Sequence, residues 1–246
     1  MFVPSTLHHK SCKIECQAYL PESFSVLCWN VHKNNKKIQF IRYLEKEISS
    51  KKINLLLFQE AAFNNGSRFM LPNMAYDAAA NLEVNGKFYG VLTASRVESS
   101  YAQAYLSEGQ EAFIGPHKSM LLTSYQFKDH EKLLVLNIHA INFRENNRYN
   151  KELERFFDFI AMYEGALLIA GDFNSWNKKR LEKLYENVNK LKLKVVSFDT
   201  QSDVKSFRGN HLDFIFYKGL ELMDASVEKA DKHSDHNPLF AKFKKI

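Results

Sequence analysis

The segment Leu167-Leu-Ile-Ala-Gly-Asp172-Phe-Asn174 runs from four apolar residues into a glycine, a carboxylate and an amide. An apolar run this short predicts a buried strand, and the glycine marks the point where that strand ends or turns. Ligands of α/β proteins gather beyond the carboxyl ends of the strands. We therefore expect Asp172 and Asn174 to lie at the rim of a sheet, where they can act on a ligand.

Three other apolar runs end on polar side chains in the same way. They are Ser25-Val-Leu-Cys-Trp-Asn30, Leu55-Leu-Leu-Phe-Gln-Glu60 and Leu133-Leu-Val-Leu-Asn-Ile-His139. If the four strands point in the same direction, their ends bring amides, carboxylates and an imidazole to one rim. The pattern therefore predicts a single polar site made from segments far apart in the chain.

Two later segments add a carboxylate and an imidazole. Asp213 stands inside the apolar run Leu212-Asp-Phe-Ile-Phe, and a buried carboxylate needs a partner. His236 stands in the turn Ser234-Asp-His-Asn-Pro238. A carboxylate that pairs with a histidine orients the ring and favours its charged form, so Asp213 and His236 are candidates for such a pair.

The remaining pattern predicts one strand-rich α/β domain over residues 23–246, preceded by an N-terminal arm over residues 1–22. Asn85-Gly86 between two predicted strands is a strong hairpin signal. Helices are expected at residues 36–50, 147–163 and 181–191, the first with Ile38, Ile41, Leu44 and Ile48 on its buried face. The irregular order of strands and helices favours mixed sheets over a fully parallel one.

The composition is that of a globular protein with a basic balance. The net charge is +6, which favours polyanionic partners such as nucleic acid, an acidic membrane surface or phosphorylated substrates. A surface that is simply rich in lysine explains the charge equally well. No apolar stretch approaches the roughly 20 residues of a membrane span, and no signal-peptide pattern is present, so a cytoplasmic location is expected, with leaderless export left open.

The three cysteines exclude a complete disulfide framework, because their number is odd. Cys12 and Cys16 could join each other or hold part of a metal site. Cys28 lies in an apolar run and is expected to be a buried strand residue.

These residue types suit the hydrolysis of a phosphate ester. A hard cation bound by carboxylates offsets the negative charge of the ester and activates water, while amides such as Asn30 and Asn174 can hold phosphate oxygens. Each residue also has an ordinary explanation, since Asn30 could cap a helix and Glu60 could be solvated. An ordinary explanation for any one residue is easy to accept, but it is much less easily accepted for six together: Asn30, Glu60, His139, Asp172, Asp213 and His236.

The motifs and their order resemble the endonuclease/exonuclease/phosphatase superfamily, and in particular a compact bacterial subgroup of it. The resemblance extends from about residue 24 to the C-terminus. It is carried by Trp29-Asn30, Gln59-Glu60, Asn137-Ile-His139, Gly171-Asp-Phe-Asn174, Leu212-Asp213-Phe214 and Ser234-Asp-His-Asn-Pro238. It implies a four-layer α/β/β/α sandwich of two mixed β-sheets flanked by helices.

The resemblance also implies a role for each site residue. Mg²⁺, or Mn²⁺ in its place, would be held chiefly by Glu60, with Asp235 and Asn30 nearby. Asp172 and Asn174 would position the attacking water and the scissile phosphate. His236, paired with Asp213, would act as base or phosphate clamp, and whether Asp172 or His236 takes the proton of water stays open. His139 would stabilise the developing charge or protonate the leaving oxygen, and Lys118 and Arg96 are candidates for substrate phosphates or for the solvated surface.

Differences between these motifs and those of known branches of the superfamily narrow the expected substrate class. Trp29-Asn-Val-His32 and Gln59-Glu-Ala-Ala62 differ from the apurinic-site endonuclease motifs, and Asn174-Ser-Trp176 differs from the inositol-polyphosphate phosphatase motif. We expect a metal-dependent phosphodiesterase or nuclease acting on nucleic acid. One alternative is an enzyme for a small or lipid phosphate, which would be favoured by aromatic residues around the site such as Phe63, Phe69, Phe143 or Trp176. Another is a non-catalytic binding module that retains the fold.

Overall fold

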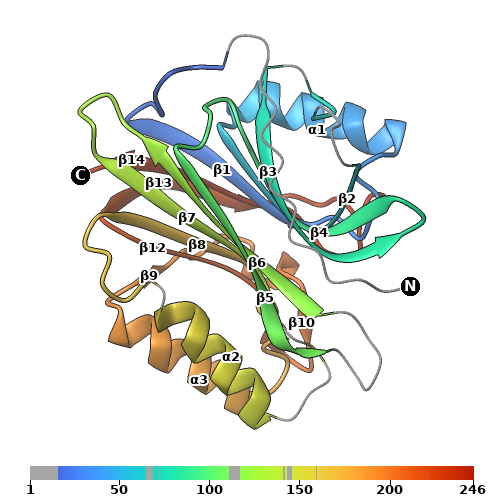
Figure 1. The fold of residues 1–246 in the computed structure, drawn as a ribbon, viewed down its shortest axis with the longest axis vertical. Helices are drawn as coiled ribbons and strands as arrows, with labels where there is room; N and C mark the ends of the chain where they lie inside the picture. The colour runs from blue at the N-terminus through green and yellow to red at the C-terminus, as the bar shows by residue number, and fades with distance from the viewer. Residues whose placement is uncertain are drawn as a thin grey trace.

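The computed structural model describes residues 16–64, 69–71, 73–110, 117–140, 142, 146–158 and 160–246. Residues 1–15 of the expected arm, including Cys12, lie outside the described residues, as does Phe143. Two six-stranded sheets pack face to face, with one helix on the outer face of the first sheet and two on the outer face of the second (Figure 1). The expected four-layer sandwich of mixed sheets is confirmed.

The first sheet has the order β13-β14-β1-β2-β4-β3. Its strands are β1 (Ser23–Asn30), β2 (Leu55–Phe63), β3 (Ala75–Val84), β4 (Lys87–Ser95), β13 (Leu220–Val227) and β14 (Leu239–Lys245). Helix α1 (Ile38–Lys51) connects β1 to β2. Asn85 and Gly86 both have positive φ between β3 and β4, as the expected hairpin requires.

The second sheet has the order β5-β6-β7-β8-β12-β9. Its strands are β5 (Tyr101–Gln110), β6 (His117–Gln126), β7 (Lys132–His139), β8 (Ala166–Asp172), β9 (Lys194–Val195) and β12 (Asp213–Lys218). Helices α2 (Asn146–Asp158) and α3 (Lys178–Lys190) cover its outer face. A short helical turn (Gln201–Asp203) and a small hairpin of β10 (Ser206–Phe207) and β11 (Asn210–His211) lead into β12.

Alternation along the central strands builds three hydrophobic layers. On β1, Val26 and Cys28 join the core between the sheets, whereas Leu27 and Trp29 face α1. On β8, Leu168 joins the core between the sheets, whereas Ile169 packs under α2 and α3. Because successive side chains of a strand point to opposite faces, an unbroken apolar run is what a strand covered on both sides needs.

Some local expectations are corrected. Ile38 was expected on the buried face of the first helix, but it is 66% exposed. It is the first residue of α1, and Phe40 is buried on the packed face of the helix in its place. Strand β13 was not anticipated, since it is an edge strand whose residues are mostly exposed or half-buried and form no apolar run. In the described part of the expected arm, Leu20 is buried and bridges to Phe127. Cys28 is free and buried, and Cys16 is disulfide-bonded.

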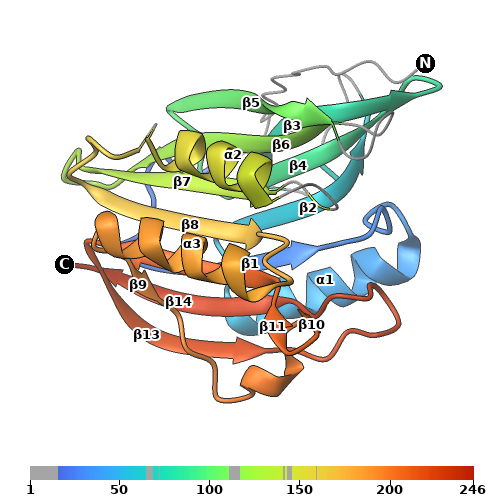
Figure 2. The same ribbon diagram turned by 90° about the horizontal axis from the view of Figure 1, so that it is seen from below.

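Two parallel pairs lie at the centre of the sandwich and determine where the site forms. Strands β1 and β2 are parallel in the first sheet, and β7 and β8 are parallel in the second. Figure 2 shows the arrowheads of β1 and β8 pointing to the same side of the molecule. The carboxyl ends of all four strands therefore meet at one rim.

Among the described residues, no helix is long and apolar enough to span a membrane.

Candidate active site

The strand registers bring the predicted polar residues together at this rim. Asn30 pairs with Gln59, the residue before Glu60, and His139 pairs with Asp172. Asp213 begins β12 directly opposite Asp172 on the antiparallel side of β8. The site therefore draws one or two residues from each of several strands of both sheets.

A β-bulge turns Glu60 out of the regular pattern of β2. The register with β4 shifts between Phe58 and Ala61, and Glu60 has a φ of 52°. Left-handed backbone is costly for a residue with a side chain and is tolerated mostly where a bulge or site requires it. The conformation places the Glu60 carboxylate 3.9 Å from Nε2 of His139 in the facing sheet.

Buried amides join the two sheets immediately beneath the rim. Gln59 Nε2 donates to Asn137 Oδ1 at 2.7 Å, and Asn137 Nδ2 donates to the carbonyls of Phe58 at 3.2 Å and Leu92 at 3.0 Å. Gln59 and Asn137 stand in the quoted motifs, but the sequence did not reveal this role. A satisfied polar network inside an apolar core fixes the relative position of the sheets.

The first cluster at the rim is centred on His139. Its Nε2 lies 3.0 Å from Nζ of Lys118 and 3.7 Å from Oδ2 of Asp172, and Asn30 Nδ2 donates to the same Asp172 oxygen at 3.1 Å. Burial, together with the positive charge of Lys118, holds the pKa of His139 well below its usual range. His139 is therefore neutral, and its Nε2 accepts a hydrogen bond from the ammonium of Lys118.

The second cluster is a histidine and two carboxylates. His236 Nδ1 lies 2.7 Å from Asp213 Oδ2, and one ligand atom from each of Asp172, Asp213 and His236 falls within 4.8 Å of the others. Burial, reinforced by the charge of Asp213, raises the pKa of Asp172 to about 6. Burial disfavours the charge on His236, but Asp213 more than offsets this and raises the pKa of His236 to about 9.

The turn that carries His236 is tied to the end of β1. Ser234 Oγ donates to the carbonyl of Asn30 at 2.6 Å and accepts from the backbone N–H of His236 at 3.2 Å. Trp29 Nε1 donates to the carbonyl of His236 at 2.8 Å. These bonds connect the turn at Ser234 and His236 to the end of β1. The first and last segments of the domain therefore hold each other in place at the rim.

Asp235 and Arg96 do not join these clusters. The half-exposed Asp235 carboxylate contacts Nδ1 of His32 at 3.0 Å and Nζ of Lys205 at 3.1 Å. Arg96 follows β4, whose last residue pairs with the start of β2, and its Nε donates to the carbonyl of Ile53 at 3.3 Å. Arg96 therefore lies at the opposite end of the sheet from Glu60, and we do not retain it as a contact for substrate phosphates.

Asn174 is held by backbone and side-chain contacts in a left-handed conformation. Its φ is 49°, its backbone N–H donates to Asp172 Oδ1 at 3.0 Å, and its Nδ2 donates to the carbonyl of Ala140 at 2.9 Å. Asparagine tolerates this region better than most residues. The side-chain oxygen of Asn174 remains the atom most suited to contact a water or a hydroxyl group of a substrate.

A fully buried arginine supports this loop from behind. Arg180 Nη1 donates to the carbonyl of Asn174 at 3.1 Å, and its guanidinium lies 4.4 Å from the ring centre of Tyr149 and 4.8 Å from that of Trp176. An arginine on an amphipathic helix usually faces water, so the sequence contains no signal for this role. The N-cap of α3, Asn177, orients the first turn that delivers Arg180.

Replacing Arg180 with methionine should destabilise the protein by about 2 kcal/mol, because the change leaves the buried carbonyl of Asn174 without its charged donor and removes two cation–aromatic contacts. Urea unfolding measures the loss. The neighbouring exposed Lys179 is the control, and Lys179→Ala should change stability by less than about 0.5 kcal/mol. Equal effects from the two substitutions would refute the supporting role of Arg180.

The donor atoms at the rim suit a hard divalent cation. Glu60 and Asp172 place carboxylate oxygens 3.9 and 3.7 Å from the same histidine nitrogen, and Glu60 is partly exposed. Asp213 Oδ1 is buried without a hydrogen-bond partner among the described residues. Mg²⁺ and Mn²⁺ take oxygen ligands of this kind, so the residues present fit such an ion. The other oxygen of Asp213 lies 2.7 Å from Nδ1 of His236, so this pair forms an acid–base group while Oδ1 stays available to a cation.

Comparison with known proteins agrees with this arrangement. A UPF0294 protein from Yersinia enterocolitica is 35% identical over 225 residues, which cover 90% of this chain and 84% of that protein. An endonuclease/exonuclease/phosphatase family protein from Leptotrichia buccalis superimposes with a TM-score of 0.65 at 15% identity, covering 90% of this chain and 99% of that one. D. rerio TDP2 complexed with single strand DNA product gives a TM-score of 0.63 at 14% identity, covering 91% and 99%.

The superimposed structures share only 14–15% sequence identity with this chain, so they show the fold alone. The family assignment rests on the sequence. The model of the Endonuclease/Exonuclease/phosphatase family matches residues 27–236, a range that includes all the residues placed at the rim. By this match, and by a fold that assembles its motifs at one rim, the chain belongs to the endonuclease/exonuclease/phosphatase family.

Proposed function

We propose that this protein is a divalent-metal-dependent phosphodiesterase that hydrolyses nucleic-acid phosphodiester bonds. The observation that carries the proposal is the meeting, at one rim, of the Glu60 carboxylate, the His139–Lys118 pair and the His236–Asp213 pair around Asp172. The net charge of +6 supports a polyanionic substrate. The family assignment supports the reaction class.

Glu60 would hold Mg²⁺ or Mn²⁺, with the side-chain oxygen of Asn30 nearby. The bound ion would offset phosphate charge and lower the pKa of a bound water. Asp235 would have to release His32 and Lys205 before it could contribute a ligand. This exchange makes Asp235 a weaker candidate than Glu60 for the main ligand.

The chain's own side chains divide the remaining work. His236 uses Nδ1 for Asp213, so Nε2 is the nitrogen that can contact a phosphate oxygen, and the pair suits a cationic clamp. Asp172 accepts hydrogen bonds from Asn30 and from the backbone of Asn174, which fix its orientation to take a proton from the attacking water. Lys118, through its contact with His139, places positive charge where the leaving oxygen develops negative charge.

Nicking of supercoiled plasmid DNA tests the proposal. The parent should nick with Mg²⁺ and stop in EDTA, and His236→Ala should slow nicking by at least about 100-fold, because it removes the phosphate clamp. The control is His130→Ala, which alters an exposed histidine in the turn between β6 and β7, at the other end of the sandwich.

Each of the other results is informative. Full activity in EDTA would exclude the metal mechanism. Equal nicking by the parent and His236→Ala would show that the site is placed wrongly. No nicking by the parent would exclude duplex DNA as the substrate. The same variants would then be tested first on single-stranded DNA and RNA, and afterwards on small and lipid phosphate esters.

A further inference from the structure

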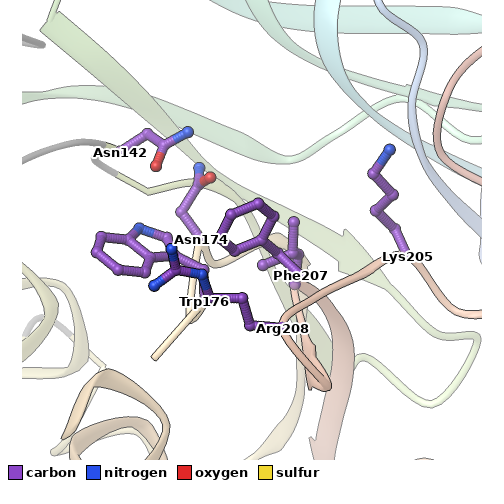
Figure 3. A pocket seen from close by; sticks show the side chains of 7 residues that line it. Asn142, Asn174, Trp176, Lys205, Phe207 and Arg208 are labelled. Atoms are coloured by element: carbon purple, nitrogen blue, oxygen red, sulfur yellow. The ribbon is translucent and has the colours of Figure 1, made fainter. Parts of the chain in front are cut away.

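A pocket of about 360 Å³ opens directly beside Asn174. It is lined mainly by apolar surface, with side chains from Asn174, Trp176, Lys205, Phe207, Arg208 and Leu212. Figure 3 shows the side chains of Asn174, Trp176 and Phe207 turned towards the same space, while Lys205 extends away from the rings. Asn174, a residue of the candidate active site, thus also lines a cavity to which the proposed chemistry assigns no role.

The hairpin of β10 and β11 holds one wall of this pocket in place. Arg208 and Gly209 have φ of 51° and 79°, which makes a tight two-residue turn of the kind that matches strand twist. Asn210 Nδ2 donates to the carbonyl of Trp176 at 3.1 Å. The wall is therefore tied by a hydrogen bond to the loop that follows Asn174.

The two aromatic rings meet edge to face and form a corner with a cation beside it. The rings of Trp176 and Phe207 lie at 89° with their centres 6.4 Å apart, and the guanidinium of Arg208 lies 5.4 Å from the centre of Phe207. Phe207 is 49% exposed, so one face of its ring is open to a ligand. Arg180, which does not line the pocket, stabilises the Trp176 ring from behind.

Positive charge distinguishes this pocket from a purely apolar one. Lys205 and Arg208 line it together with the aromatic side chains of Trp176 and Phe207. A heteroaromatic base can stack on an aromatic face and beside a guanidinium, whereas an acyl chain has no π-face for either contact.

We propose that this pocket holds one unpaired nucleobase of the nucleotide that carries the scissile phosphate. The inference rests on the proposed function and deepens it, because it restricts the substrate to single-stranded or locally unpaired nucleic acid. Phe207 and Trp176 contact the base, and Arg208 and Lys205 attract the flanking phosphates. Asn174, at the border of the pocket, then meets the phosphate attached to that nucleotide.

Binding without metal tests the pocket separately from catalysis. In EDTA, deoxyadenosine 5′-monophosphate should bind the parent roughly ten-fold more tightly than 2-deoxyribose 5-phosphate, which lacks the base. Calorimetric titration measures both affinities. The chain has two tryptophans, and Trp29 is buried against Phe40, so quenching of fluorescence by the nucleotide reports on Trp176.

Variants of Phe207 then locate the base. Phe207→Ala and Phe207→Leu should remove most of the ten-fold preference, and Phe207→Tyr should keep it because a ring is retained. The matched control is Tyr101→Ala, since Tyr101 is also 49% exposed but lies at the end of β5 that is remote from the rim. An unfolded Phe207→Ala variant would be recognised by its circular dichroism, and the Leu and Tyr pair then decides.

Three results would overturn the inference: equal affinities in the parent, a preference that survives Phe207→Ala, or tighter binding of dodecyl phosphate than of the nucleotide with the same sensitivity to Phe207. Failure of the proposed function has a different signature. A preference for the nucleotide without cleavage of either plasmid or single-stranded oligonucleotides would reject the nuclease activity and keep the pocket. Cleavage with equal affinities would reject the pocket alone.

Discussion

Asp172→Asn should lower the rate of Mg²⁺-dependent phosphodiester hydrolysis by at least about 10³-fold and at the same time stabilise the metal-free protein. The rate falls because asparagine cannot take a proton from water. Stability rises because Asp172 is buried opposite Asp213, and removing the repulsion between the two carboxylates outweighs the loss of one of the two hydrogen bonds that the Asp172 oxygens accept. Burial and the charge of Asp213 raise the pKa of Asp172 to about 6, so ionisation opposes folding.

The sign of the pH dependence follows from this raised pKa. An unfolded aspartate ionises near pH 4, so the parent loses stability as the pH rises from about 4 to about 6. The variant lacks this loss and should exceed the parent by about 1–3 kcal/mol above pH 7, with a smaller difference at pH 4.5. Urea unfolding in EDTA at both pH values measures the difference, and single-turnover nicking with Mg²⁺ measures the rate.

The exposed Asp158 at the end of α2 is the matched control. Asp158→Asn should change neither the rate nor the stability appreciably, because the carboxylate is solvated and remote from the rim. An Asp172→Asn enzyme that retains more than about a tenth of the rate would remove Asp172 from the role of proton acceptor. A stability lower than that of the parent at pH 7.5 would contradict the predicted repulsion between Asp172 and Asp213.

Gly171→Ala should destabilise the protein by about 4 kcal/mol or prevent folding. Gly171 has a φ of 148°, and a Cβ placed on it would meet the backbone carbonyl oxygen of Ile138 at 1.9 Å. Strands β7 and β8 would have to separate just where His139 and Asp172 leave them. The glycine is therefore required by the close approach of the two backbones, and the site depends on it.

The control for Gly171 is a glycine with a similar backbone requirement but open space. Gly86 has a φ of 74°, and a Cβ there would meet nothing within 4 Å. Gly86→Ala should cost only about 1 kcal/mol, from the left-handed conformation alone. The free energies of unfolding of the two variants, measured in urea, separate conformational cost from steric clash. Similar losses would mean that the contact with Ile138 relaxes easily.

Much of the fold could be predicted because its central strands are covered on both faces. Strands such as β2 and β8 need unbroken apolar runs, and this requirement is visible in the sequence without any partner. The polar residue at the end of each run was visible for the same reason. Strand β13 could not be recognised, since an exposed edge strand has no apolar run to mark it.

The candidate site divides in the same way. Asp213 was suspected of having a partner because a charge within an apolar run cannot stay unpaired, and the structure places it 2.7 Å from His236. Both a contact with substrate phosphates and a place on the solvated surface were left open for Arg96, because the end of a strand does not say which end of the sheet it reaches; the register places Arg96 at the opposite end of β2 from Glu60. Arg180 was missed, since its helix has the polarity of an ordinary surface helix.

By itself, the sequence determined the central strands of the two sheets, the chemical types at their ends and the family to which the chain belongs. Only the tertiary structure decided that Asp235 contacts His32 and Lys205, that Arg180 is buried behind Asn174, and that Trp176 and Phe207 enclose a pocket. The physical reason is one of range. Burial of a strand is a local property of its residues, whereas the contacts of a loop side chain depend on where distant strands end.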